Sequence, residues 1–244
     1  MNDYLKIIAG ILAAVVLNLI LSRNGKDYAV YTGDYIFTKC FEVLSQNYDL
    51  HHMKELSGAI SRICIGEIEQ FDGRFKTHTS VKKYLRVVGA KTSALLVMSL
   101  SVGAYESGCD EAFCKKLGRI GLHIGNAFQI IDDILDYMGT DVVGKPLGAD
   151  ILEHKVTLPL FGALSSVSAE KADAVMAKVA DIDSHPEYRD EIVRFVKENA
   201  GVEYAVARLN EYVSEAVDAL EVLPPSLSRD YLVELAYYTA NRAM

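Results

Sequence analysis

Carboxylates and lysines gather in the segment 128–159, and their types and spacing suit the binding of a metal ion and an anion. Asp132 and Asp136 are four residues apart, so on a helix they point from the same face, with Asp133 rotated to its side. Carboxylates this close repel one another unless a cation neutralises them. Mg²⁺ typically takes one or two protein carboxylates together with waters and phosphate oxygens. A hard cation such as Mg²⁺ would therefore make this cluster of carboxylates favourable.

The residues that follow the aspartates are suited to an anion. We expect the helix to end near Gly139, because glycine adopts a left-handed cap conformation without steric cost. Beyond it, Lys145 and Lys155 lie in a glycine-containing loop that allows the backbone to approach a ligand closely. Carboxylates for a metal, followed by lysines for phosphate, predict a diphosphate site bridged by Mg²⁺.

The alternative is a solvated acidic helix face, which carboxylates at this spacing commonly form. The neighbours of the aspartates argue against it because they are apolar on nearly every side of the helix. We therefore expect a mostly buried helix whose acids line an interior cavity. The apolar neighbours are Phe128, Ile130, Ile131, Ile134, Leu135 and Tyr137.

Length and composition indicate one helical domain over residues 1–244. No Pro-, Gly- or Ser-rich linker divides the chain, and half of its residues are hydrophobic. The net charge of −8 argues against nonspecific binding of nucleic acid and leaves local lysines and metal ions to receive an anionic substrate. The four cysteines lack the spacing of a metal site or disulfide framework, so we interpret them as buried thiols of a cytoplasmic protein.

The N-terminal part contains two ambiguous features. The apolar run from Leu5 to Leu21 is marginal in length for a transmembrane helix and lacks the basic start and cleavage site of a secretory signal. We favour a buried core helix over a membrane anchor. His51 and His52 have no partner at metal-ligand spacing, and we interpret them as a solvated start of a helix from about Lys54 to Asp72.

Further helices are expected along the rest of the chain. Residues 84–106 form a long helical pattern with no charge between Lys91 and Glu106, so the lysine stands at the mouth of an apolar segment, unless it merely extends to the surface. A central helix should begin at Glu111 and pack closely at its glycines. Four helical patterns between residues 169 and 244 show core spacing only; one of them places apolar residues at Ala205, Leu209, Tyr212, Val213, Ala216 and Leu220.

Several segments together resemble the trans-type isoprenyl diphosphate synthases. FQIIDDILD and GKPLGADILEHKVTLPL look like the second aspartate-rich motif of that family and the loop after it. AVYTGDYIFTKCFEVLS, GEIEQ and YLRVVGAKTSALLVMSLSVGA follow the family's order upstream of them, so the resemblance covers the chain from about Ala29 to its end. It implies an all-α isoprenoid-synthase-type bundle of antiparallel helices around a central cavity.

The resemblance also implies a reaction and a role for individual residues. Relatives condense isopentenyl diphosphate with an allylic diphosphate in the presence of Mg²⁺. Metal binding would fall to Asp132 and Asp136, with Asp133 assisting, and the catalytic residues would be Lys91, Asp132 and Lys145. The residues that contact diphosphate would be Lys91, Thr92, Gln129, Lys145 and Lys155.

The sequence departs from the family pattern in two places. No DDxxD precedes Asp132, which suggests an N-terminally shortened domain, and His154 stands where relatives usually have glycine. We therefore expect either a prenyltransferase or the subunit of one that carries the second aspartate motif. The alternative is a non-catalytic homologue that binds Mg²⁺-diphosphate or pairs with an active synthase. A homodimer, or a heterodimer with a complementary subunit, is expected, and the length of the product is not readable.

Overall fold

The computed structural model describes residues 31–39, 42, 50–74, 80–138 and 147–241. All regular structure in these ranges is helical, which confirms the predicted all-α class. Contacts divide the chain into two compact units, residues 1–55 and 56–244, and each is described by itself. One domain over residues 1–244 stays a prediction.

The first unit is described only in part. Residues 31–39 are helical, and α3 (Leu50–Gly73) begins in this unit. Because α3 starts before Lys54, His51 and His52 lie inside its first turns, and the side chain of His52 is buried. The predicted solvated helix start is therefore wrong for His52. The apolar run from Leu5 to Leu21 lies outside the described residues.

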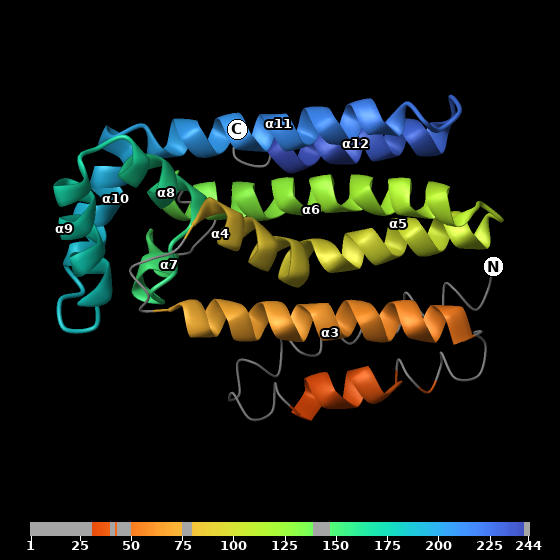
Figure 1. Cartoon of the computed structure of the whole chain (residues 1–244), viewed down its shortest axis with the longest axis horizontal. Helices are drawn as coiled ribbons and strands as arrows, with labels where there is room; N and C mark the ends of the chain where they lie inside the picture. The colour runs from red at the N-terminus through yellow and green to blue at the C-terminus, as the bar shows by residue number, and fades with distance from the viewer. Residues whose placement is uncertain (1–30, 40–41, 43–49, 75–79, 139–146, 242–244) are drawn as a thin grey trace. The chain divides into compact units, whose positions relative to one another are not determined.

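Helix α6 (Glu111–Met138) is the centre of the second unit. It lies between α5 (Ala94–Glu106) on one side and α11 (Gly201–Leu220) and α12 (Leu227–Asn241) on the other (Figure 1). Most apolar neighbours of the aspartates are buried, as predicted, but Phe128 is 40% exposed, so that helix face was placed wrongly. The buried members are Ile130, Ile131, Ile134 and Tyr137.

Glycines allow α6 to approach its neighbour closely, as the sequence predicts. A methyl group at Gly121 would lie 2.5 Å from the Leu96 carbonyl oxygen, and one at Gly125 would lie 2.6 Å from the Ser93 Cα. No other residue fits those two positions without moving backbone. The close approach fixes the segment around Ser93 against the helix that carries the aspartates.

The long helix predicted over residues 84–106 has a change of winding in its middle. It runs as α4 (Val81–Val88), the π-helical turn η2 (Gly89–Ser93) and α5, and the Ser80 hydroxyl accepts a hydrogen bond from the Lys83 amide at its start. Such π turns are rare in proteins, and those that occur are often found at functional sites. By length and composition alone, residues 81–106 would suffice to cross a membrane, although this test is also met by core helices.

The remaining helices complete the bundle and a smaller core. The four C-terminal helices confirm the prediction for residues 169–244: α9 (Ala169–Ala180), α10 (Tyr188–Glu198), α11 and α12. Before them, α7 (Ala149–Leu152) and α8 (Leu158–Ser165) follow the aspartate helix. Ile151 and Leu160 from these two helices pack with α9 and α10 in a core cluster separate from the one around α6. Among the described cysteines, Cys64 is exposed and Cys109 and Cys114 are half-buried, so the expectation of buried thiols is wrong for these three; Cys40 lies outside the described residues.

Candidate functional site

A cavity of about 300 Å³ brings most of the predicted site residues together. It opens between α3, α4, η2, α6 and the turn that joins α7 to α8. Asp136 is not among its lining residues, and Lys145 lies outside the described residues. The predicted residues that line the cavity are Lys91, Thr92, Gln129, Asp132, Asp133 and Lys155.

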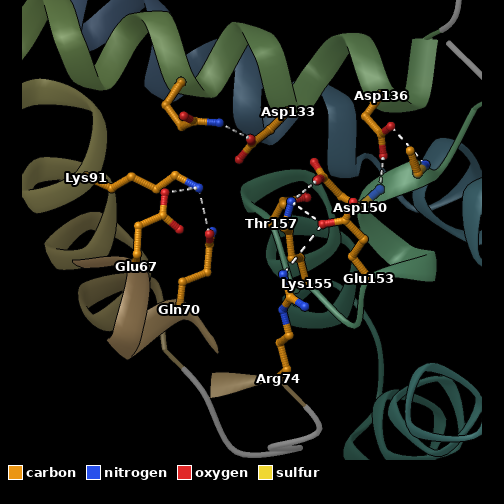
Figure 2. A network of polar contacts seen from close by, with 12 residues as sticks. Glu67, Gln70, Arg74, Lys91, Asp133, Asp136, Asp150, Glu153, Lys155 and Thr157 are labelled. Atoms are coloured by element: carbon orange, nitrogen blue, oxygen red, sulfur yellow. Dashed lines mark hydrogen bonds and ion pairs between the residues drawn. The ribbon is translucent and has the colours of Figure 1, made fainter. Parts of the chain in front are cut away.

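Lys91 reaches the cavity from the π turn η2. Its ammonium nitrogen lies 3.0 Å from Glu67 Oε1 and 2.9 Å from Gln70 Oε1, both on α3 (Figure 2). A methyl group at Gly66 would lie 3.0 Å from the Lys91 backbone nitrogen, so the glycine lets the two helices meet here. The lysine is therefore presented to the cavity already paired with one carboxylate.

Lys155 enters from the opposite side, on the turn between α7 and α8. Its ammonium nitrogen lies 2.9 Å from Asp150 Oδ1 and 2.8 Å from Glu153 Oε2. Burial opposes its charge, but these hydrogen bonds outweigh burial and raise the pKa of Lys155. Arg74 lies 3.7 Å from Glu153 on the same side (Figure 2), and the hydrogen bond from Lys155 lowers the pKa of Glu153.

Asp133 is a buried carboxylate with protein donors on both oxygens. The Tyr84 hydroxyl donates to Oδ2 over 2.6 Å, and the Gln129 amide nitrogen donates to Oδ1 over 2.9 Å. The Gln129 amide oxygen in turn accepts a hydrogen bond of 2.7 Å from the Thr92 hydroxyl. Burial raises the pKa of Asp133 to about 7, although both hydrogen bonds favour the ionised form. Asp133 therefore orients the amide that holds Thr92.

Asp136 caps the short helix α7. Its two oxygens accept hydrogen bonds of 2.9 Å and 3.1 Å from the backbone N–H groups of Ala149 and Asp150 (Figure 2). Its backbone oxygen also accepts a hydrogen bond of 2.8 Å from the Gly148 amide. Burial raises the pKa of Asp136, and the two backbone donors oppose that shift. These contacts join the end of the aspartate helix to the turn that carries Lys155.

Asp132 is the aspartate whose position best suits a metal ligand. It lines the cavity beside Gln129, whereas Asp133 is almost fully buried and Asp136 is not among the lining residues. In the part of the chain that the structure describes, no three His, Cys, Asp or Glu side chains surround one point as metal ligands. The described residues thus fit an ion held by one carboxylate and by substrate oxygens, an arrangement that Mg²⁺ commonly adopts.

Several lining residues were missed from the sequence. Arg74, Lys83 and Tyr84 line the cavity, but they come from helix ends whose meeting in space leaves no local pattern. Gln70 also lines the cavity, and the GEIEQ element marked its helix from the sequence; what the sequence did not show is that Glu67 and Gln70 both contact Lys91.

Comparisons with known proteins identify the family to which the chain belongs. The family model described as polyprenyl synthetase matches residues 17–196. An octaprenyl diphosphate synthase from Haemophilus influenzae is 33% identical over 219 residues, which cover 89% of this chain and 66% of that protein. The heptaprenyl diphosphate synthase component 2 of Bacillus subtilis is 33% identical over 215 residues, which cover 88% of this chain and 61% of that protein.

The solved structures give the same fold. A polyprenyl synthase from Caulobacter crescentus CB15, complexed with calcium and isoprenyl diphosphate, aligns with a TM-score of 0.83 at 27% identity. The alignment covers 92% of this chain and 69% of that one. The helical bundle and its cavity are those of an isoprenoid-synthase-type protein. The chain belongs to the polyprenyl synthetase family, and it spans just under two thirds of the length of these two curated relatives from Haemophilus and Bacillus.

Proposed function

We propose that the chain is a trans-prenyltransferase, or the subunit of one that carries the second aspartate motif. Its reaction would condense isopentenyl diphosphate with an allylic diphosphate. The observation that carries this proposal is one cavity that holds Lys91, Lys155 and Asp132, in a chain of the polyprenyl synthetase family. Cationic side chains and a carboxylate for a metal suit a diphosphate, whose negative charge grows as it departs.

The chain's own residues would position the diphosphate. Lys91 and Lys155 reach the cavity from opposite sides and would each contact diphosphate oxygens, with Thr92 and Gln129 held between them by their mutual hydrogen bond. Lys145 is proposed for the same role from the sequence alone. Val87, Val88 and Val156 give the cavity an apolar part of its lining, which would help to exclude water that would otherwise capture an allylic cation.

Asp132 would hold Mg²⁺, which would neutralise charge on the departing diphosphate. Asp133 and Asp136, also predicted as metal ligands, accept one hydrogen bond on each oxygen and keep lone pairs for an ion, but Asp133 is buried and Asp136 lies outside the cavity lining. We therefore assign them to orienting Gln129 and to capping α7, and keep Asp132 as the primary ligand.

Assembly and location are proposed on narrower grounds. One relative is named as component 2 of a heptaprenyl diphosphate synthase, which supports a heterodimer with a complementary subunit alongside a homodimer. We propose a cytoplasmic location. A non-catalytic homologue that binds Mg²⁺-diphosphate would share the cavity, so turnover is the property that separates it from an enzyme.

Incorporation of labelled isopentenyl diphosphate into allylic substrates with Mg²⁺ tests the proposal. We expect product from the purified chain, alone or with a complementary subunit. Asp132→Ala should lower the rate about 100-fold or more, because one metal-binding charge is lost. Calorimetry with inorganic diphosphate and Mg²⁺ should show the same dependence on Asp132.

The matched control is Glu111→Ala, which removes an exposed carboxylate at the other end of the same helix, where it pairs with Lys115 over 2.6 Å. It should leave the rate unchanged. Binding that needs Asp132, but no product under any pairing of subunits, would support the non-catalytic homologue. If diphosphate binds equally to the wild type and to Asp132→Ala, the site assignment is wrong.

A further inference from the structure

His154 has a backbone conformation that residues with side chains rarely adopt. Its φ is 57°, and within the described residues only Ala200, with φ 54°, shares a positive φ without being glycine. The reason is the end of α7: the His154 amide donates to the Ile151 oxygen and the Lys155 amide donates to the Asp150 oxygen, each over 2.9 Å. This is the Schellman arrangement, in which glycine is the usual residue because it adopts positive φ without strain.

The imidazole of His154 is buried and makes a specific contact. Its Nε2 lies 3.0 Å from Oδ1 of Asp183, which belongs to the connection between α9 and α10. The residue also lines the cavity next to Lys155. This side chain is buried at a backbone position that residues with side chains rarely adopt, and a carboxylate from a distant segment lies beside it, although that carboxylate is 72% exposed.

The same turn determines where Lys155 lies. Because the Lys155 amide is bonded back to Asp150, the direction of its side chain follows from the left-handed conformation of the residue before it. Its ammonium then returns to Asp150 Oδ1 and faces the cavity. A contact that holds the His154 ring therefore also limits movement of the lysine.

We propose that His154 is a positioning residue for Lys155. Burial holds the imidazole in place beside the exposed carboxylate of Asp183, and the imidazole fixes the turn that presents the lysine to a diphosphate. This inference rests on the proposed function, because positioning Lys155 matters only if the cavity binds a diphosphate. The alternative is that histidine is merely tolerated here, in which case glycine would serve the site equally well or better.

The first test measures binding of inorganic diphosphate with Mg²⁺ by calorimetry. His154→Gly relieves the backbone strain but removes the ring, and we expect binding to weaken about tenfold through misplacement of Lys155. Asp183→Asn should weaken it in the same direction. Ala200→Gly is the matched control, because it relieves the same kind of strain at the start of α11, outside the cavity lining.

A double-mutant cycle decides whether the effect passes through Lys155. In a Lys155→Met background, His154→Gly should cause no further loss of binding, because the group that it positions is gone. An equal loss in both backgrounds would overturn the proposal. So would unchanged or tighter binding by His154→Gly, with thermal unfolding used to confirm that each variant is folded.

Hydrogen exchange separates this inference from the proposed function. The Lys155 amide is bonded to the Asp150 oxygen, and its exchange should become faster in His154→Gly and Asp183→Asn but stay unchanged in Ala200→Gly. If wild type fails to bind diphosphate while the exchange pattern appears, the proposed function falls and the positioning role stands. If Lys155 exchanges equally in all variants, the positioning role falls whatever the binding result.

Discussion

The two lysines of the cavity are held by different kinds of structure. Lys91 sits in a helix, on a π turn that α6 fixes by close backbone packing at Gly125. Lys155 sits on a turn that hydrogen bonds, a left-handed residue and the Asp136 cap hold together. The first side is fixed by packing, and the second by polar contacts.

Their acidic partners differ as well. Glu67, which pairs with Lys91, has a side chain that is 52% exposed. Lys155 pairs with Glu153, which is similarly exposed at 54%, but also with Asp150, which is only 21% exposed. An exposed carboxylate can move into water when an anion arrives, but a buried one cannot leave cheaply. The Lys91 side is therefore free to exchange its partner, and the Lys155 side is built to stay as it is.

The largest effect should come from breaking the packed side. Gly125→Ala would place a methyl group 2.6 Å from the Ser93 Cα, so backbone has to move, and we expect a loss of about 2–3 kcal/mol in the free energy of unfolding. The displaced π turn should also reduce diphosphate binding. Urea denaturation and calorimetry measure the two effects.

Gly103→Ala is the matched control in α5, where an added methyl group meets nothing within 4 Å. It should stabilise the protein by about 0.5–1 kcal/mol, because alanine is the better helix former. If both variants behave alike, packing at Gly125 does not fix the Lys91 side.

The next effect separates the two lysines by their partners. Lys155→Met leaves the partly buried Asp150 without its cation, and we expect unfolding free energy to fall by about 1–2 kcal/mol, less than for a fully buried pair. Lys91→Met leaves an exposed glutamate, which water can solvate, and should cost no more than about 0.5 kcal/mol. Urea denaturation of both variants under one set of conditions makes the measurement. Equal losses of unfolding free energy in the two variants would show that Lys91 and Lys155 are not held differently by their partners.

Much of this fold could be predicted from local pattern. Apolar spacing indicated the helices from residue 111 to 138 and from 169 onwards, because periodicity reports burial directly. The glycines of α6 indicated close packing, and the structure places backbone against Gly121 and Gly125. Of the residues predicted for the site, Lys91, Asp132 and Lys155 line one cavity.

What could not be predicted depends on contacts between distant segments. The sequence assigned all three aspartates to a metal, with Asp133 assisting, and did not show that Asp133 meets Tyr84 from another helix or that Asp136 meets the backbone of α7. The π turn at residues 89–93 has no sequence signature of its own. The sequence marked His154 only as a departure, since its positive φ follows from how α7 ends.

The smallest effect concerns the exchange of Glu67 for an anion at Lys91. The direction of the change in diphosphate affinity shows whether this exchange occurs. If Glu67 competes with an anion for Lys91, Glu67→Gln should tighten metal-free binding of inorganic diphosphate by about threefold at low ionic strength. Glu153→Gln should change it less, because Asp150 still holds Lys155. Glu69→Gln is the matched control from the same helix, since Glu69 pairs with Arg86 over 3.0 Å.

Calorimetry of the three variants distinguishes exchange at Lys91 from a general charge effect and from a holding role of Glu67. Tighter binding by all of them to the same extent would indicate a general reduction of negative charge around the cavity, without specific exchange at Lys91. Weaker binding by Glu67→Gln would show that the glutamate holds the lysine in its binding position, because the neutral amide would then orient it less firmly. In that case Glu67 would fix Lys91 in place just as Asp150 fixes Lys155. The greater exposure of Glu67 would then not distinguish the Lys91 side from the Lys155 side.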